Sequence, residues 1–125
     1  MIAADTSAVL HFLHGRDSPA RFAVRAALID NALALPPPVV AELLSGPERE
    51  PRLDEVLEIA SRLPLLDGFW ERAGETRRAI LVRGLRARLA DTLVAQACLD
   101  TDVALIAADG DFRHFAAHCG LRLAV

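Results

Sequence analysis

The 125-residue chain contains no lysine, so all 14 of its basic residues are arginines. This absence excludes any mechanism that requires a lysine ammonium group. Cysteine is also scarce: Cys98 and Cys119 do not form a Cys-x-x-Cys pair, and two cysteines are too few for a disulfide framework. The formal net charge is −3, so overall charge does not by itself predict nucleic-acid binding.

Long apolar runs, repeats and low-complexity tracts are absent as well. No apolar run approaches the ~18–20 residues that cross a membrane, and the first residues lack the basic region of a secretory signal. No P-loop, Gly-x-Ser-x-Gly or dinucleotide-binding glycine motif occurs. We therefore expect a cytoplasmic protein without membrane contact and with one domain over residues 1–125. Apolar residues make up 53% of the chain, which predicts a globular core and apolar surface left for a partner.

Short apolar segments alternate with longer amphipathic ones along the chain. This alternation is the pattern of a parallel α/β sheet. Strands are expected at residues 2–4, 32–35, 63–66, 103–107 and 121–124. Helices are expected at residues 6–14, 19–31, 38–44, 52–61, 70–82, 90–99 and 111–118.

Several acidic residues fall where a parallel sheet places its ligand chemistry, at the carboxyl ends of the strands. Asp5 follows the first expected strand, and Asp109 and Asp111 follow the strand at 103–107. Asp91 opens a helix, and Glu42 lies in the short helix after the second strand. These five carboxylates are therefore expected near one rim of the sheet.

Each acid alone has a simpler structural interpretation. Asp5, Asp91 and one of Asp109 or Asp111 would serve as helix N-caps, and Glu42 would be a solvated surface residue. These structural roles do not explain why the acids lie close together, because two carboxylates about 4 Å apart repel by about 4 kcal/mol at an effective dielectric near 20. A cluster of oxygen ligands without His or Cys selects a hard divalent ion such as Mg²⁺ or Mn²⁺. The pattern predicts an acidic metal pocket for phosphodiester chemistry.

Four segments together resemble the PIN-domain family, and more narrowly the VapC toxins of bacterial VapBC toxin–antitoxin pairs. The resemblance covers almost the whole chain and rests on the order and spacing of Asp5-Thr6-Ser7-Ala8-Val9-Leu10, Glu42-Leu43-Leu44-Ser45-Gly46, Ala90-Asp91-Thr92-Leu93-Val94-Ala95 and Asp109-Gly110-Asp111-Phe112. It implies a PIN-like three-layer α/β/α fold with a short central parallel sheet. It also implies an Mg²⁺- or Mn²⁺-dependent endoribonuclease that is held inactive by a VapB-like antitoxin.

The resemblance also implies roles for individual residues. Asp5, Glu42, Asp91 and Asp109 match the acidic quartet of the family, and Asp111 matches a further supporting acid. We expect Asp5, Asp91 and Asp109 to ligate the metal, and Glu42 to hold a metal-bound water or act as a base toward it. Thr6 and Ser7 match small hydroxyl residues that orient neighbouring carboxylates.

One position departs from the family pattern. The family commonly has Thr or Ser two residues before the fourth acid, where this chain has Ala107. A lost hydroxyl at such a position weakens metal affinity or rate by about 10–100-fold. The alternative is therefore a catalytically weak or inactive PIN-like module that binds RNA or a protein partner without cutting.

An acidic pocket needs flanking cations to hold a polyanion. Six arginines concentrate between Trp70 and Asp91, and Arg113 follows the last acid; the six are Arg72, Arg77, Arg78, Arg83, Arg86 and Arg88. Individually they are also compatible with a solvated helix face paired with Glu71 and Glu75. As a group they predict a phosphate track, with Arg86, Arg88 and Arg113 the RNA-binding candidates.

Other chemistries have weaker signals. His11, His14, His114 and His118 have helical zinc-binding spacings but no suitable third ligand, so we expect surface histidines. Receiver domains and haloacid-dehalogenase-type phosphatases need a lysine that this chain lacks. The aromatic residues are expected in the core or in interfaces. Apolar side chains also offer faces for a second copy, as in a homodimer, and for an antitoxin helix: Leu10, Phe12, Leu13, Phe22, Leu43 and Leu44.

Overall fold

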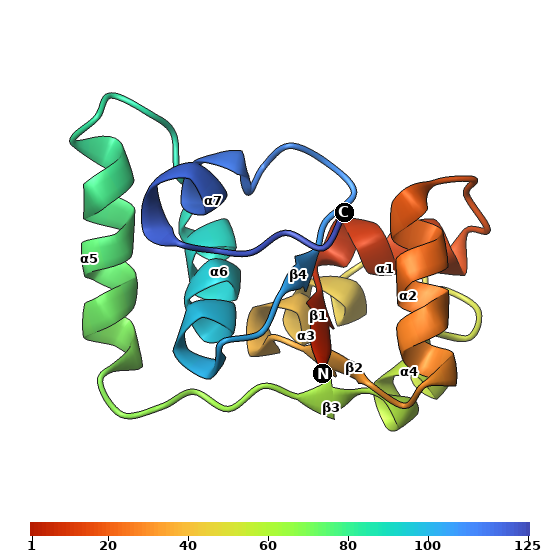
Figure 1. The fold of residues 1–125 in the computed structure, drawn as a ribbon. Helices are drawn as coiled ribbons and strands as arrows, with labels where there is room; N and C mark the ends of the chain where they lie inside the picture. The colour runs from red at the N-terminus through yellow and green to blue at the C-terminus, as the bar shows by residue number, and fades with distance from the viewer.

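A central sheet of four parallel strands organises the protein. The computed structural model describes residues 1–125. The strands are β1 (Ile2–Ala4), β2 (Leu33–Leu35), β3 (Ser61–Arg62) and β4 (Leu105–Ile106), in the spatial order β3-β2-β1-β4. β1 pairs through Ala3 with Ala34 of β2 on one side and with Leu105 of β4 on the other. The predicted parallel sheet is confirmed (Figure 1).

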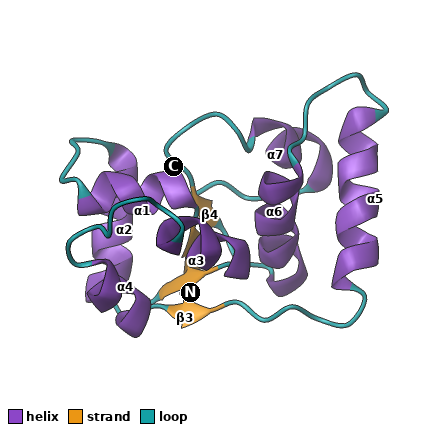
Figure 2. Cartoon of the chain, turned by 180° about the vertical axis from the view of Figure 1, so that it is seen from behind, coloured by secondary structure: helices purple, strands orange, loops and turns teal.

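Seven helices surround the sheet and form the outer layers. They are α1 (Thr6–Leu13), α2 (Pro19–Ile29), α3 (Pro37–Leu44), α4 (Leu53–Ile59), α5 (Phe69–Leu81), α6 (Leu89–Thr101) and α7 (Arg113–Cys119). Both views place α1, α2 and α4 to one side of the strands and α5, α6 and α7 to the other (Figures 1 and 2). This arrangement confirms the predicted α/β class with three layers. No helix has the length and apolar character needed to cross a membrane.

The central strands are apolar on both faces because helices cover both faces of the sheet. Ala3 and Ala4 of β1 and Ala34 of β2 are completely buried. Their small side chains let the flanking helices approach the sheet, while Leu35 and Ile106 fill the core beside them. The sheet therefore holds the ends of β1 and β4 in fixed positions, and the chain turns from these ends toward Asp5 and Asp109.

Two predicted strands were wrong in position or extent. The strand expected at 63–66 lies instead at Ser61–Arg62, and pairing ends where the Leu63 amide donates to Leu35. Pro64 follows and has no N–H for the ladder, which leaves Leu65 and Leu66 exposed. The strand expected at 121–124 is reduced to one bridge between Leu105 and Leu123.

The region before the last helix is also less regular than predicted. β4 covers only Leu105–Ile106 of the expected 103–107, and α7 begins at Arg113 instead of residue 111. Asp109 Oδ1 accepts a hydrogen bond from the Asp111 amide at 3.0 Å, so these residues form a turn. Both acids consequently lie in the loop between β4 and α7.

Candidate functional site

A hollow of about 220 Å³ lies at the carboxyl ends of β1 and β4. Four separate segments of the chain contribute carboxylates to it: the end of β1, helix α3, the start of α6 and the β4–α7 loop. The lining residues are Asp5, Thr6, Ser7, Leu10, Glu42, Arg88, Asp91, Val94, Asp109, Asp111 and Phe112. The structure thus brings all five sequence-predicted acids to one place, which we call the acidic hollow.

Asp5 is the most buried of these carboxylates, with 5% of its surface exposed. It is the N-cap of α1, and its Oδ1 accepts a hydrogen bond from the Ala8 amide at 2.8 Å. The Ser7 hydroxyl donates to both Asp5 oxygens, at 2.9 and 2.8 Å. Asp5 therefore caps α1 and also lines the hollow, so its role as a helix cap does not exclude a role in the site.

Burial raises the pKa of the Asp5 carboxyl from 3.8 to about 7, because the charged form loses its hydration. The hydrogen bonds from Ala8 and Ser7 lower this pKa, and the negative charges of Asp109 and Asp91 raise it further. The ionised form of Asp5 is consequently costly in this hollow unless a cation compensates it.

Asp91 lies in the first turn of α6, but it does not cap the helix, because the N-cap position is Arg88. The capping interpretation is therefore wrong for this residue. Burial raises the pKa of Asp91 to about 6; Asp111, Glu42 and Asp109 also raise it, while Arg88 lowers it. These couplings show that the carboxylates of the hollow feel one another's charge.

Glu42 reaches the hollow from α3, where its surroundings are exposed to solvent. The Thr6 hydroxyl donates to Glu42 Oε1 at 2.8 Å. This contact joins residues that are 36 positions apart and directs the Glu42 carboxylate toward the end of β1. Thr6 and Ser7 therefore each donate a hydrogen bond to one of the acids.

Ser7 has an additional contact that sequence reasoning missed. Its hydroxyl accepts a hydrogen bond from the Ala108 amide at 3.2 Å while it donates to Asp5. This residue thus connects the first acid to the loop that carries Asp109 and Asp111. Ala107, which precedes Ala108 in the chain, is buried and has no polar side-chain atom. The hydroxyl near this loop therefore comes from Ser7. A backbone donor has no signature in a sequence, so this hydrogen bond is evident only from the folded structure.

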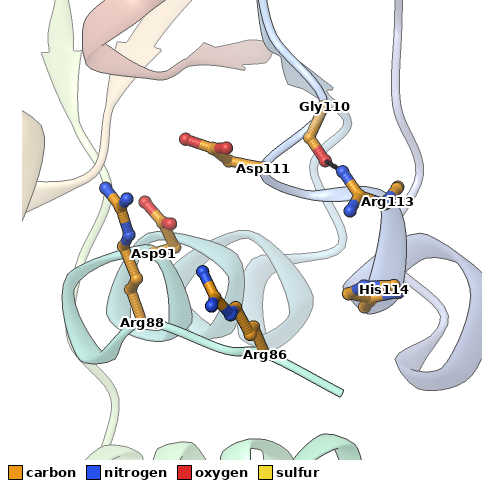
Figure 3. Close-up of a pocket in the computed structure, with 7 residues that line it drawn as sticks. All are labelled: Arg86, Arg88, Asp91, Gly110, Asp111, Arg113 and His114. Atoms are coloured by element: carbon orange, nitrogen blue, oxygen red, sulfur yellow. Dashed lines mark hydrogen bonds between the residues drawn. The ribbon is translucent and has the colours of Figure 1, made fainter.

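A second hollow of about 180 Å³ adjoins the first and shares Arg88, Asp91 and Asp111 with it. Arg86, Arg113, His114 and Gly110 complete its lining, and none of its residues is apolar. Figure 3 shows Arg88 beside Asp91, with the Asp111 carboxylate facing them. We call this the basic hollow. It brings together the three arginines that were predicted to bind RNA, and it includes His114, which was predicted only as a surface histidine.

The other arginines of the predicted phosphate track have structural partners or lie elsewhere. Arg72 donates to both oxygens of Asp100, at 2.9 and 2.7 Å, and so joins α5 to α6. Arg77 donates to the Ala87 carbonyl oxygen at 2.8 Å. Neither of these residues, nor Arg78 or Arg83, lines the acidic or basic hollow. Of the arginines in the predicted phosphate track, only Arg86, Arg88 and Arg113 line a hollow beside the acids.

The acidic hollow offers the oxygen ligands that a hard divalent cation prefers. No group of three or more His, Cys, Asp or Glu side chains has the arrangement of a formed metal site. Mg²⁺ commonly keeps several waters and takes only one or two protein carboxylates, with substrate phosphate completing its shell. The donor set and the raised pKa values of Asp5 and Asp91 fit such an ion.

Comparisons with known proteins agree with this architecture. A family model described as PIN domain matches residues 2–118. A chain of the VapBC2 complex from Rickettsia felis, solved with a promoter DNA fragment, is similar with a TM-score of 0.76 and 19% identity, over 98% of this chain and 97% of that chain. A chain of the DNA-bound VapBC complex from Salmonella typhimurium gives a TM-score of 0.74 and 14% identity, with coverages of 98% and 97%.

A third similar structure is a toxin–antitoxin complex from Klebsiella pneumoniae. Its matching chain has a TM-score of 0.72 and 18% identity, and the match covers 97% of this chain and 95% of that chain. No curated protein matches the sequence. At these low identities the structural similarities establish a shared fold.

Proposed function

This chain belongs to the PIN-domain family, and on that premise we propose that it is a VapC-type toxin: an Mg²⁺- or Mn²⁺-dependent endoribonuclease that a VapB-like antitoxin neutralises. The observation that carries the proposal is the meeting of Asp5, Glu42, Asp91, Asp109 and Asp111 around one hollow. Residues this far apart in the chain have no structural reason to place like charges together. In a nuclease that binds a divalent cation, the charge of the cation compensates the clustered carboxylates.

In the proposed mechanism Asp5, Asp91 and Asp109 would hold the cation, one or two of them directly and the rest through its waters, and Asp111 would support them. When bound, the cation lowers the pKa of water and offsets the charge that develops on the phosphate. Glu42, held by the Thr6 hydroxyl, accepts the proton of the attacking water. Ser7 keeps the Asp5 carboxylate oriented into the hollow. Arg86, Arg88 and Arg113 attract the RNA strand.

The decisive test is metal-dependent cleavage of RNA by the purified protein. We expect EDTA to stop cleavage and Mn²⁺ to restore it in the wild type but not in Asp5→Asn. Asparagine keeps the helix-capping acceptor, so this variant should remain folded. Asp17→Asn, which changes an exposed aspartate outside the hollow, should cleave like the wild type. Full activity in Asp5→Asn would refute the proposal.

The alternative function is an RNA- or protein-binding module that does not cut. Ala107 favours it, because this position lacks the hydroxyl that the family commonly has. The same assay separates the two functions. A protein that binds RNA in EDTA but neither binds Mn²⁺ nor cleaves RNA in its presence would be a binding module.

The antitoxin partner is proposed from exposed apolar surface. Phe22 is 53% exposed, Ile29 68% and Ile59 50%. Ile29 and Ile59 line a groove whose apolar part also includes Phe12, Leu28 and Val56 and whose charged part consists of Arg25, Arg52 and Glu55. Exposed apolar side chains also remain on the α5 side, where Trp70 is 63% exposed, which suits the proposed homodimer. Sedimentation of the protein with and without its partner tests both associations, and a lone monomer that never binds a VapB-like chain would contradict them.

A further inference from the structure

Two segments of the chain build the basic hollow: the segment before α6 carries Arg86 and Arg88, and the start of α7 carries Arg113. In the segment before α6, Ala87 is buried and its carbonyl oxygen accepts from Arg77. Its neighbours Arg86 and Arg88 both line the hollow (Figure 3).

Arg113 enters from the opposite wall. Its Nη1 donates to the Gly110 carbonyl oxygen at 3.1 Å, which folds the guanidinium back over the loop (Figure 3). A Cβ atom on Gly110 would lie 3.1 Å from this same Nη1. A side chain at position 110 would therefore shift the Arg113 guanidinium by a few tenths of an ångström.

None of these three guanidiniums forms a close ion pair within the protein, although the charge of Arg88 lowers the pKa of Asp91. Five ion pairs are present, and none of them involves Arg86, Arg88 or Arg113, although Asp91 and Asp111 line the same hollow. Three arginines face two carboxylates, so the formal charge of the lining is positive. The lining has no apolar side chain on which a base would pack. A small anion with several acceptor oxygens fits this chemistry best, since guanidinium groups form strong charge-assisted hydrogen bonds to phosphate.

We infer that the basic hollow holds a second phosphate of the RNA strand, next to the phosphate that is cut in the acidic hollow. The two hollows adjoin through Arg88, Asp91 and Asp111, so one strand can enter both. The inference rests on the proposed ribonuclease function and specifies its substrate: a strand with at least two consecutive phosphates, not a lone phosphodiester.

The first test measures binding without cleavage, by fluorescence anisotropy of a labelled RNA dodecamer in EDTA. We expect Arg86→Ala and Arg113→Ala each to raise the dissociation constant about tenfold. Each should also lower the slope of log affinity against log salt by about 0.7, the value for one lost phosphate contact on a single strand. Arg83→Ala removes the same charge from an exposed position outside the hollow and should change binding less than about twofold. Equal losses in all three variants, or none, would overturn the inference.

Gly110→Ala separates the position of Arg113 from its charge. The added methyl group displaces the guanidinium by a few tenths of an ångström and leaves the net charge unchanged. We expect weaker binding by about threefold, because charge-assisted hydrogen bonds depend on geometry. Wild-type affinity in this variant, together with wild-type affinity in Arg113→Ala, would exclude Arg113 from the site.

The second test asks whether the bound phosphate is adjacent to the cleaved one. Cleavage with Mn²⁺ is compared for an adenine dinucleotide with no terminal phosphate, with a 5′-phosphate and with a 3′-phosphate. One added phosphate should raise kcat/KM about tenfold in the wild type and less than about twofold in the Arg86→Ala/Arg113→Ala double variant. No gain from either phosphate, or an equal gain in both proteins, would overturn the adjacency.

The outcomes also separate this inference from the proposed function. If Asp5→Asn abolishes cleavage while Arg86→Ala and Arg113→Ala do not change RNA binding or cleavage, the proposed ribonuclease function stands and the second phosphate site is wrong. If Arg86 and Arg113 contribute to RNA binding but the protein never cleaves RNA, the proposed ribonuclease function is wrong. The proposal that the bound phosphate lies next to the cleaved one is then wrong as well.

Discussion

Asparagine in place of Asp5 should make the metal-free protein more stable at neutral and alkaline pH. The substitution removes the charge of a carboxyl that is 5% exposed. It retains an acceptor for the Ala8 amide, and asparagine is as good an N-cap as aspartate. The Ser7 hydroxyl, which donates to Asp5, can accept from the new amide group. The predicted effect therefore reflects charge and not lost contacts.

The size and sign follow from the pKa of Asp5, which rises from 3.8 to about 7 on folding. This difference corresponds to about 4 kcal/mol against the ionised form in the folded state. The folded protein binds the proton more tightly than the unfolded chain, so this contribution is fully present below pH 3.8. It declines as pH rises and is lost above about 7. The asparagine side chain does not ionise, so the advantage of the variant should grow from near zero at pH 4 to about 4 kcal/mol at pH 8.

The assay is urea unfolding in EDTA, followed by circular dichroism between pH 4 and pH 8. Asp17→Asn controls for the loss of one exposed negative charge. Addition of Mg²⁺ at pH 8 should reduce the difference in unfolding free energy between the variant and the wild type, because a ligand that binds only the folded wild type stabilises it. A variant that is no more stable than the wild type at pH 8 in EDTA would show that Asp5 is not held at this energetic cost.

Three further predictions concern the neighbours of the site and the core. Ser7→Ala removes the donor to Asp5 and the acceptor for Ala108, so Mn²⁺ affinity measured by calorimetry should fall about 10–100-fold; unchanged affinity would exclude a positioning role. Thr6→Val releases Glu42 and should lower kcat for RNA about tenfold at saturating Mn²⁺, and an unaltered kcat would count against Glu42 as the base. Ile80→Ala removes most of a fully buried side chain in α5 and should lower the free energy of unfolding in urea by about 2–5 kcal/mol, while RNA cleavage at low temperature persists. A decrease of less than about 1 kcal/mol in the unfolding free energy would mean that the core at α5 is not packed as described.

Much of the site could be predicted because strand ends are visible in a sequence. Asp5 follows the apolar residues of β1, and Asp109 follows those of β4; parallel pairing of β1 with β4 then brings their carboxyl ends together. Asp91 and Glu42 lie on helices and not at strand ends; the alternation of strands and helices still predicted them near the same rim, and the family resemblance supplied their expected roles. The contact from Thr6 to Glu42 spans 36 positions and depends on the packing of α1 against α3.

The remaining errors have local physical causes. An apolar run such as residues 63–66 resembles a strand, but Pro64 cannot donate to the ladder, so pairing stops at Leu63. The arginines of α5 are close to Asp91 in sequence, yet Arg72 pairs with Asp100 on α6 instead. Whether an arginine pairs with a carboxylate of the protein or is free to contact substrate depends on which carboxylate lies next to it in the fold. The periodicity of a sequence does not contain that information.

Calorimetric titration with Mn²⁺ at pH 7, in two buffers of different ionisation enthalpy, tests the central claim that these acids form one cation site. The wild type should bind Mn²⁺ and release protons, because Asp5 with a pKa of about 7 must ionise to ligate it. Asp5→Asn and Asp91→Asn, altered at positions far apart in the chain, should both lose most of that affinity, and Asp5→Asn should lose most of the proton release as well. Wild-type Mn²⁺ binding in either variant, or no binding in the wild type, would contradict a shared site.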